Sequence, residues 1–187
     1  MEQRLPLPRS RPVNPGASAG IAYELPHLGN ISYENAVANP LAQNKTIIAT
    51  TDDTAGGQVY IYVGTKQAAG TEIDKAGLTN GALYGIKVTG VLNEENGTIA
   101  NGNFTLQEMG VGGDVSNLTG AALQTESVAE GVTGFLRPEE AAWDPDHPNV
   151  LYFVTTNGFG QPWRLYQATF VDIANRAIRR RSNPASC

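Results

Sequence analysis

The sequence has a single cysteine, few large aromatic residues and no excess of positive charge. One cysteine, Cys187, excludes an internal disulfide framework and any zinc site of the CxxC kind. The 13 basic and 18 acidic residues give a net charge of −5, which argues against nucleic acid as a partner. No run of 18 apolar residues occurs, so no membrane span is predicted. The first residues, MEQRLPLPRSRPVNPG, lack the apolar stretch of a signal peptide.

The two ends of the chain differ in composition from its body. Residues 1–20 have prolines at positions 6, 8, 12 and 15, which predicts an extended leader without a core of its own. Residues 176–187 hold four of the 13 basic residues and no acidic one. We interpret 176–187 as a basic tail, which is either an anion-binding arm or a disordered or artefactual end. Residues 21–175 are therefore predicted to form the folded part.

A repeat at a spacing of 105 residues is the most informative pattern in the sequence. Residues 34–63 align without a gap on residues 139–168. In each copy a glutamate opens a strand of small residues, a turn with proline follows, and two β-branched and aromatic strands come next. This order is typical of three antiparallel strands in one propeller blade. The residues that recur unchanged in the second copy are Glu34, Ala36, Pro40, Asn44, Thr50 and Thr51.

The spacing also predicts how many blades the chain holds. Blades of known propellers run about 40–50 residues, so 105 residues fit two blades, and strands at 81–88 and 102–107 would form the intervening one. The predicted fold is all-β, an incomplete β-propeller of about three to four antiparallel blades. Because a closed propeller needs at least four blades, we expect the chain to be a piece of a longer protein.

Two segments between the strands predict short helical insertions instead. The polar segment 65–81 contains one expected helical turn near Glu72–Ala76. The segment 116–129 has apolar residues at helical spacing, with Ser116 as the expected N-cap and Gly131 as the expected stop.

Several motifs resemble the bacterial PhoX-type alkaline phosphatases. RPEEAAWDPDHPNVLYFVTTN at 137–157 is similar to the family pattern R-P-E-D-G-x-W-D-P with a strand that ends in T-T-D, and GNISYENAVANPLAQNKTIIATTDD at 29–53 is similar to an earlier blade. The resemblance implies a periplasmic or secreted six-bladed propeller that hydrolyses small phosphate monoesters. It also implies a calcium and iron centre in the central channel.

The chain departs from this family pattern at three points. Glu140-Ala141 replaces the usual Asp-Gly, Asn157 replaces a usual Asp, and the iron-bridging cysteine has no counterpart. Calcium is therefore the cofactor that we expect, and iron is expected only in a full-length parent.

Glu34 and Glu139 are the main candidate metal ligands. They occupy the same position in two blades, so the symmetry of a propeller would turn both carboxylates towards one axis. Two converging carboxylates repel each other unless a cation neutralises them, and calcium prefers oxygen ligands of this kind. Alternatively, each glutamate caps exposed strand N–H groups at the rim of the channel or pairs with Arg137.

Asp52, Asp53 and Arg137 complete the candidate site. The two aspartates end a strand, where they would add oxygen ligands to the metal or act as turn residues. Arg137 is the candidate catalytic residue, as a bidentate clamp for the phosphate group, unless it forms a salt bridge with Glu139 or Glu140. The sequence thus predicts a fragment of a calcium-dependent phosphatase. The alternative is a propeller that serves as a binding or scaffold module, with an inactive isolated chain.

Overall fold

The computed structural model describes residues 21–94, 99, 102–161, 163–173 and 185–186. The predicted leader at 1–20 and all but two residues of the tail at 176–187 lie outside the described residues. The helical elements are η1 (Pro26–Leu28), α1 (Glu72–Lys75) and α2 (Gly120–Ala129). The strands are β1 (Tyr33–Ala38), β2 (Lys45–Asp52), β3 (Ala55–Gly57), β4 (Val59–Thr65), β5 (Ala82–Val88), β6 (Asn103–Glu108), β7 (Phe135–Leu136), β8 (Pro138–Trp143), β9 (Val150–Thr155), β10 (Arg164–Thr169) and β11 (Ala185–Ser186).

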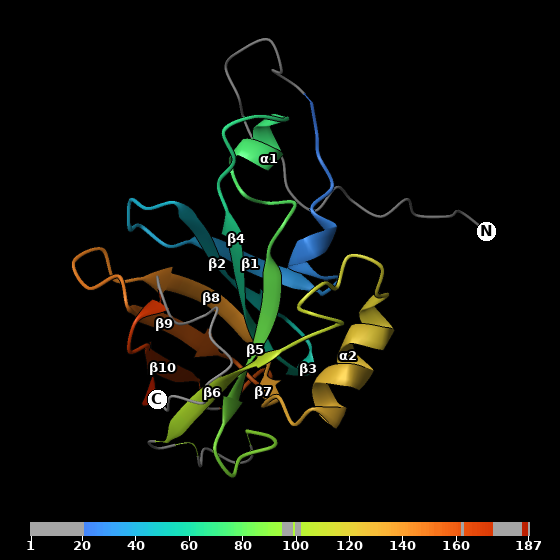
Figure 1. The fold of residues 1–187 in the computed structure, drawn as a ribbon. Helices are drawn as coiled ribbons and strands as arrows, with labels where there is room; N and C mark the ends of the chain where they lie inside the picture. Colours follow the sequence, from blue (N-terminus) through green and yellow to red (C-terminus); the bar gives the residue numbers. More distant parts are fainter. Residues whose placement is uncertain (1–20, 95–98, 100–101, 162, 174–184, 187) are drawn as a thin grey trace.

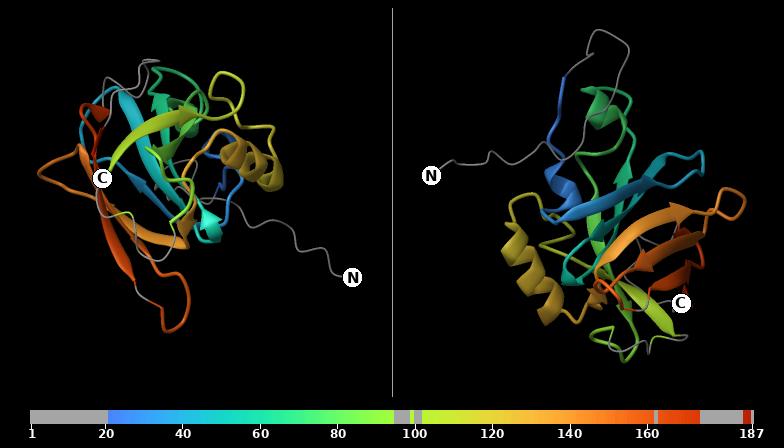
Figure 2. Two further views of the ribbon diagram at one scale, coloured as in Figure 1. Left: turned by 90° about the horizontal axis from the view of Figure 1, so that it is seen from below. Right: turned by 180° about the vertical axis from the view of Figure 1, so that it is seen from behind.

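Antiparallel pairing joins most of these strands into one curled sheet. In the described residues the order is β1-β2-β4-β5-β6-β11-β10-β9-β8, and β3 pairs with β7 separately. The two ends of this order, β1 and β8, lie side by side without pairing, as the blue and orange strands of Figure 2 show. The predicted all-β class, with antiparallel blades, an unclosed sheet and short helical insertions, is confirmed.

The two repeat copies fold as predicted into three-stranded units, β1-β2-β4 and β8-β9-β10. The intervening strands also form, because β5 and β6 lie at the expected positions and pair with each other. However, β5 pairs with β4 as well, so β5 and β6 extend the sheet of the first unit. They do not stand apart as a separate blade.

The gap-free alignment of the two copies is wrong by one residue in the last strand. Ile48 pairs with Tyr62 in the first unit, whereas Phe153, the repeat partner of Ile48, pairs with Tyr166. The cause is the turn, since the nine residues 51–59 lie between Thr50 and its partner Tyr60, whereas only the eight residues 156–163 lie between the equivalent Thr155 and its partner Arg164. A one-residue change in register moves side chains to the opposite face of a strand.

Two apolar clusters hold the fold together. The main cluster lies inside the curl of the sheet, where Phe135 packs edge-on against Phe153 with ring centres 5.2 Å apart. The second cluster lies on the other face of β2, β4 and β5, where Tyr62 and Leu83 pack with Leu123 of α2. Figure 1 shows α2 beside β5 on this face. These clusters bury the apolar rows that the alternating strands create, which is the main driving force for such a fold.

The described residues cover the sheet of the second unit on one face only. Phe153 and Tyr166 point into the main cluster, while Leu165 on the opposite face of β10 is 69% exposed. Gln167 of β10 and Ala142 of β8 are exposed as well. The first unit, by contrast, has an apolar cluster against each face of β2 and β4.

The two helical insertions form, with one correction. The turn predicted near Glu72–Ala76 is α1, which Thr71 and Asp74 cap reciprocally. The second insertion is α2, but its N-cap is Thr119, whose hydroxyl accepts a hydrogen bond from Ala122 N at 3.2 Å. Ser116 is not the N-cap, because its backbone N–H donates to Asp114 in the preceding turn. No helix among the described residues has the length and apolarity needed to cross a bilayer.

Candidate functional site

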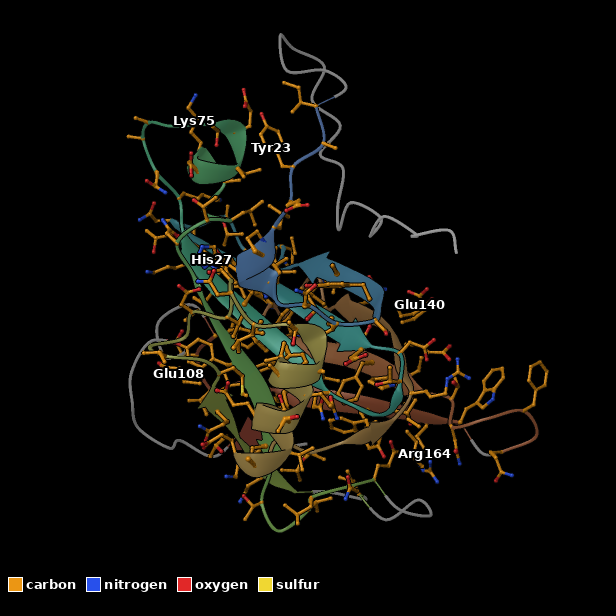
Figure 3. The ribbon with its side chains drawn as sticks, turned by 90° about the vertical axis from the view of Figure 1, so that its right-hand side faces the viewer. Tyr23, His27, Lys75, Glu108, Glu140 and Arg164 are labelled. Carbon is orange, nitrogen blue, oxygen red and sulfur yellow. The ribbon has the colours of Figure 1, made fainter. Side chains whose placement is uncertain are left out.

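The candidate site lies along the seam where β1 meets β8. Side chains join these two strands although their backbones do not pair. Trp143 Nε1 donates to Val37 O at 3.0 Å, and Asn35 Nδ2 donates to Glu140 Oε2. Figure 3 shows Glu140 on the side of the molecule away from Glu108. The strands that carry Glu34 and Glu139 therefore face each other here.

Arg137 lies at the centre of the site, held by two carboxylates. Its Nε lies 2.9 Å from Asp53 Oδ1 and its Nη2 lies 3.1 Å from Asp53 Oδ2, which is a bidentate pair. The same Nη2 lies 3.1 Å from Glu139 Oε1. Arg137 therefore forms the salt bridge that was the alternative to a phosphate-binding role. Glu139 is one of its partners, as expected, and Asp53 is the principal one.

Glu34 acts on Arg137 through its charge and not through a contact. The hydrogen bond that Arg137 donates to Asp53, with the charge of Asp53, raises the pKa of Arg137, and the negative charges of Glu139 and Glu34 add to this rise. Glu34 is exposed, whereas Asp53 and Glu139 each keep 24% of their side chains accessible. Two of the four predicted metal-ligating carboxylates thus contact the guanidinium, and a third adds its charge.

Two threonines that sequence reasoning missed support Glu139. Thr156 Oγ1 donates to Glu139 Oε1, and Thr51 Oγ1 donates to the backbone oxygen of Glu139 at 2.6 Å. Thr51 also accepts from Asn35 N at 3.1 Å, so it connects β1, β2 and β8. These threonines are repeat partners, and their identity in both copies is the signal that would have found them.

The backbone is unusual at the same place. Arg137 and Asn157 have φ values of 58° and 56°, in the left-handed region that residues other than glycine rarely adopt. They are neighbours, because Asn157 N donates to Leu136 O at 2.9 Å and Thr156 N donates to Arg137 O at 3.2 Å. Such conformations cost of order 1–3 kcal/mol and persist where the surrounding contacts determine them.

Asp52 lies in a different environment from Asp53. Its Oδ1 accepts from Ser32 N and from Thr54 Oγ1, each at 3.2 Å, and only 6% of the residue is exposed. Burial raises the pKa of the Asp52 carboxyl above its ordinary value. The structure therefore places Asp52 at the buried end of β2, while Asp53 reaches Arg137.

The donor chemistry of the group suits a hard cation, but the number of donors is small. Carboxylates and hydroxyls are the ligands that calcium prefers, and calcium takes six to eight of them. No cluster of three or more His, Cys, Asp or Glu side chains within the described residues has the geometry of a metal site. The single positive charge of Arg137 already balances one of the two carboxylates that it contacts. The described residues thus do not form a calcium site by themselves.

One nitrogen of the Arg137 guanidinium takes no part in the ion pairs with Asp53 and Glu139. Asp53 and Glu139 engage Nε and Nη2, and Nη1 donates no hydrogen bond to any described residue. The side chain of Arg137 is 38% exposed. A guanidinium with two fixed nitrogens and one open one is suited to binding an anion in a defined orientation.

The likeness to known proteins lies in the fold. No family model matches the sequence, and no curated protein matches it either. Among solved structures, the chain is similar to Pseudomonas fluorescens PhoX in complex with vanadate, a transition state analogue, with a TM-score of 0.54 and 18% sequence identity. The match covers 87% of this chain and 32% of the PhoX chain. The resemblance seen in the sequence is therefore confirmed at the level of the fold, which this chain shares with about a third of PhoX.

Proposed function

We propose that this chain supplies part of the phosphate-binding and metal-binding centre of a phosphate-monoester hydrolase. The observation that supports this most directly is the group of Glu34, Asp53 and Glu139 around Arg137. The fold likeness to PhoX, whose structure holds vanadate as a transition state analogue, supports the same assignment. Because the chain spans 32% of the PhoX chain, other parts of the active centre would come from elsewhere in the protein.

Arg137 has the role of binding the phosphoryl group in this proposal. Its open Nη1 donates to a phosphoryl oxygen, and charge-assisted hydrogen bonds of this type are strong. Asp53 fixes the plane of the guanidinium through its two hydrogen bonds, at 2.9 and 3.1 Å. The substrate class is a small phosphate ester, since a single arginine edge matches one phosphate group and no nucleic-acid surface is implied.

Glu34 and Glu139 are the proposed calcium ligands, with Asp53 beside them. Calcium held by these residues would supply a Lewis acid for a phosphoryl oxygen or a water molecule. Thr156 holds the carboxylate of Glu139 in place, and Thr51 holds its backbone. Ser32 N and Thr54 Oγ1 both donate to Oδ1 of Asp52, so Asp52 would join this ligand set only through Oδ2. Further oxygen ligands would come from outside the described residues. The family resemblance implies a periplasmic or secreted location for such an enzyme.

Phosphate binding to the purified chain tests this proposal. We expect Arg137→Asn to weaken the affinity for inorganic phosphate about tenfold or more, because a charged hydrogen bond is lost. Asparagine tolerates the left-handed backbone, so the variant removes the charge and keeps the fold. Lys66→Gln is the matched control, since Lys66 is an exposed cation after the far end of β4. Equal phosphate affinity of Arg137→Asn and the wild type would contradict the proposed role.

Thermal unfolding with and without calcium tests the metal part. A ligand that binds the folded state alone raises the melting temperature. We therefore expect calcium to stabilise the wild type and to stabilise Glu139→Gln less. Absence of a calcium effect, together with no calcium-dependent hydrolysis of a simple aryl phosphate, would remove the metal from the proposal.

A scaffold propeller without catalysis is the second candidate function. It is favoured by the salt bridges of Arg137, which give both Asp53 and Glu139 a cationic partner without any metal. It is also favoured by Asn157, an amide at the position where the PhoX-type pattern has a carboxylate. Elemental analysis of the purified protein separates the two, because the enzyme requires bound metal and the scaffold does not.

A further inference from the structure

Glu94 is a buried carboxylate that contacts the residue preceding Arg137. It belongs to the connection between β5 and β6, and its side chain is 0% exposed. Its Oε1 accepts from three groups of the β9–β10 hairpin, and its Oε2 accepts from the backbone N–H of Leu136 at 2.8 Å. The three donors to Oε1 are Thr155 Oγ1 at 2.9 Å, Arg164 Nη1 at 3.0 Å and Tyr166 OH at 2.8 Å.

The two oxygens of Glu94 serve different purposes. A buried carboxylate is strongly disfavoured unless it is paired and hydrogen-bonded, and Arg164 with two hydroxyls meets this need at Oε1. Oε2 instead binds a main-chain N–H next to Arg137. This contact fixes a backbone position, because Leu136 is held at its N–H by Glu94 and at its C=O by Asn157 N at 2.9 Å.

The peptide group held in this way joins Leu136 to Arg137. Arg137 follows Leu136 with a φ of 58°, a conformation that needs support from its surroundings. This conformation directs the side chain to Asp53 and Glu139, with the contacts described above. The support from Glu94 therefore bears on the orientation of the guanidinium.

The repeat shows that this arrangement belongs to the second unit alone. The residue of the first copy that aligns with Arg137 is Ser32, and the one that takes the place of Arg164 in the observed register is Tyr60, so neither position carries a positive charge. A contact needed only for blade packing would be expected in both copies. Instead, the buried ion pair occurs in the unit that contains Arg137. Figure 3 shows Arg164 on the same side of the molecule as Glu140.

We propose that Glu94 is a positioning residue, which holds the backbone at Leu136 so that Arg137 engages Asp53 and Glu139 through Nε and Nη2 and keeps Nη1 open. The inference rests on the proposed function only in treating Arg137 as the anion-binding group. The positioning itself is a statement about geometry, and it is measurable without any ligand.

The Nε–H signal of Arg137 in the NMR spectrum reports this positioning. In the wild type this proton is hydrogen-bonded to Asp53, so we expect a shifted signal that exchanges slowly with water. Glu94→Gln keeps the size of the side chain and removes one acceptor, and we expect the signal to move towards that of a free arginine. Phosphate affinity should fall at least about fivefold, as expected for a misplaced charged donor. Tyr60→Phe is the matched control, because it removes a buried hydroxyl from the other apolar cluster.

Glu94→Asp provides a second variant in case Glu94→Gln does not fold. The shorter carboxylate keeps its charge for Arg164 but does not reach Leu136 N at the same time, so the Arg137 signal should again move. A wild-type Arg137 signal in the folded Glu94 variants, with only lower stability, would overturn the inference and leave the proposed function intact. A moved signal, with no phosphate binding even by the wild type, would support the positioning and overturn the proposed function.

Discussion

Asn35 and Glu140 occupy neighbouring strands at the seam, and Asn35 Nδ2 donates a hydrogen bond to Glu140 Oε2. They stand 105 residues apart, so they are the same position in the two copies of the repeat. The symmetry that the sequence shows is therefore a contact in the structure. Of the two residues in this contact, Glu140 stands at the position where the PhoX-type pattern has Asp.

The coupling between Asn35 and Glu140 is the first prediction. Their contact is an exposed hydrogen bond from a neutral amide to a carboxylate, which we expect to contribute no more than an exposed ion pair does, about 0.2–1 kcal/mol. In a double-mutant cycle with Asn35→Ala and Glu140→Gln, urea unfolding should give a coupling free energy in this range. Because Asn35 Nδ2 also contacts Ala141 O, Asn35→Ala should destabilise more than Glu140→Gln. A coupling energy of zero would show that the seam does not depend on this pair.

Trp143 is expected to contribute more to the seam. It is 8% exposed, and its indole N–H donates to Val37 O at 3.0 Å. Trp143→Phe removes the hydrogen bond and part of the packing, so the free energy of unfolding should fall by about 1–3 kcal/mol. Trp163→Phe is the control, since Trp163 is 79% exposed and should change stability by no more than about 0.5 kcal/mol. Similar losses for both variants would contradict the packing role.

Asp52→Asn should stabilise the protein at neutral pH. Burial raises the folded-state pKa of Asp52, so its contribution to stability is full below about pH 4 and is lost as the pH rises through that raised pKa. Asparagine keeps an acceptor for Ser32 N and Thr54 Oγ1 and does not titrate. We expect a higher melting temperature at pH 7, by up to about 4 °C, and a smaller difference near pH 4. A difference that grows towards acid pH would contradict this, and Asp146→Asn serves as an exposed control.

Tyr60→Phe is expected to destabilise the second apolar cluster. The Tyr60 hydroxyl lies 3.0 Å from Gln58 Oε1 and 2.8 Å from Ser127 Oγ, and all three residues are fully buried. Removal of the hydroxyl leaves the buried Gln58 oxygen without this donor, so about 1–3 kcal/mol should be lost in urea unfolding. Ser127→Ala should cost less, because Tyr60 retains Gln58 as its acceptor. The reverse order of the two losses would contradict this account.

The sequence predicted the parts of the site that depend on local strand patterns. Glu34 and Glu139 open equivalent strands, so a repeat was enough to place both beside one seam. The difference between Asp52 and Asp53 was not predictable in this way. Adjacent residues at the end of a strand point in opposite directions, and only the three-dimensional path of the turn shows that Asp53 meets Arg137.

Glu94 was not found from the sequence for a different reason. Its partner Arg164 lies 70 residues away, and the short segment around Glu94 has no pattern that distinguishes it from a polar loop. The register of β10 and the N-cap at Thr119 were missed for a related reason. Both depend on how many residues a turn uses, which tertiary packing decides more than local propensity does.

The seam between β1 and β8 has a consequence for how the protein fluctuates. In the described residues, side chains hold this junction, and no backbone ladder crosses it. A curled sheet with such a junction can separate there without breaking the hydrogen bonds within either half. Amide protons on the outer edge of β1 should therefore exchange with deuterium sooner than those shared between β2 and β4. The guanidinium and carboxylates beside that junction would become accessible in the same motion, which gives a solute a route to them.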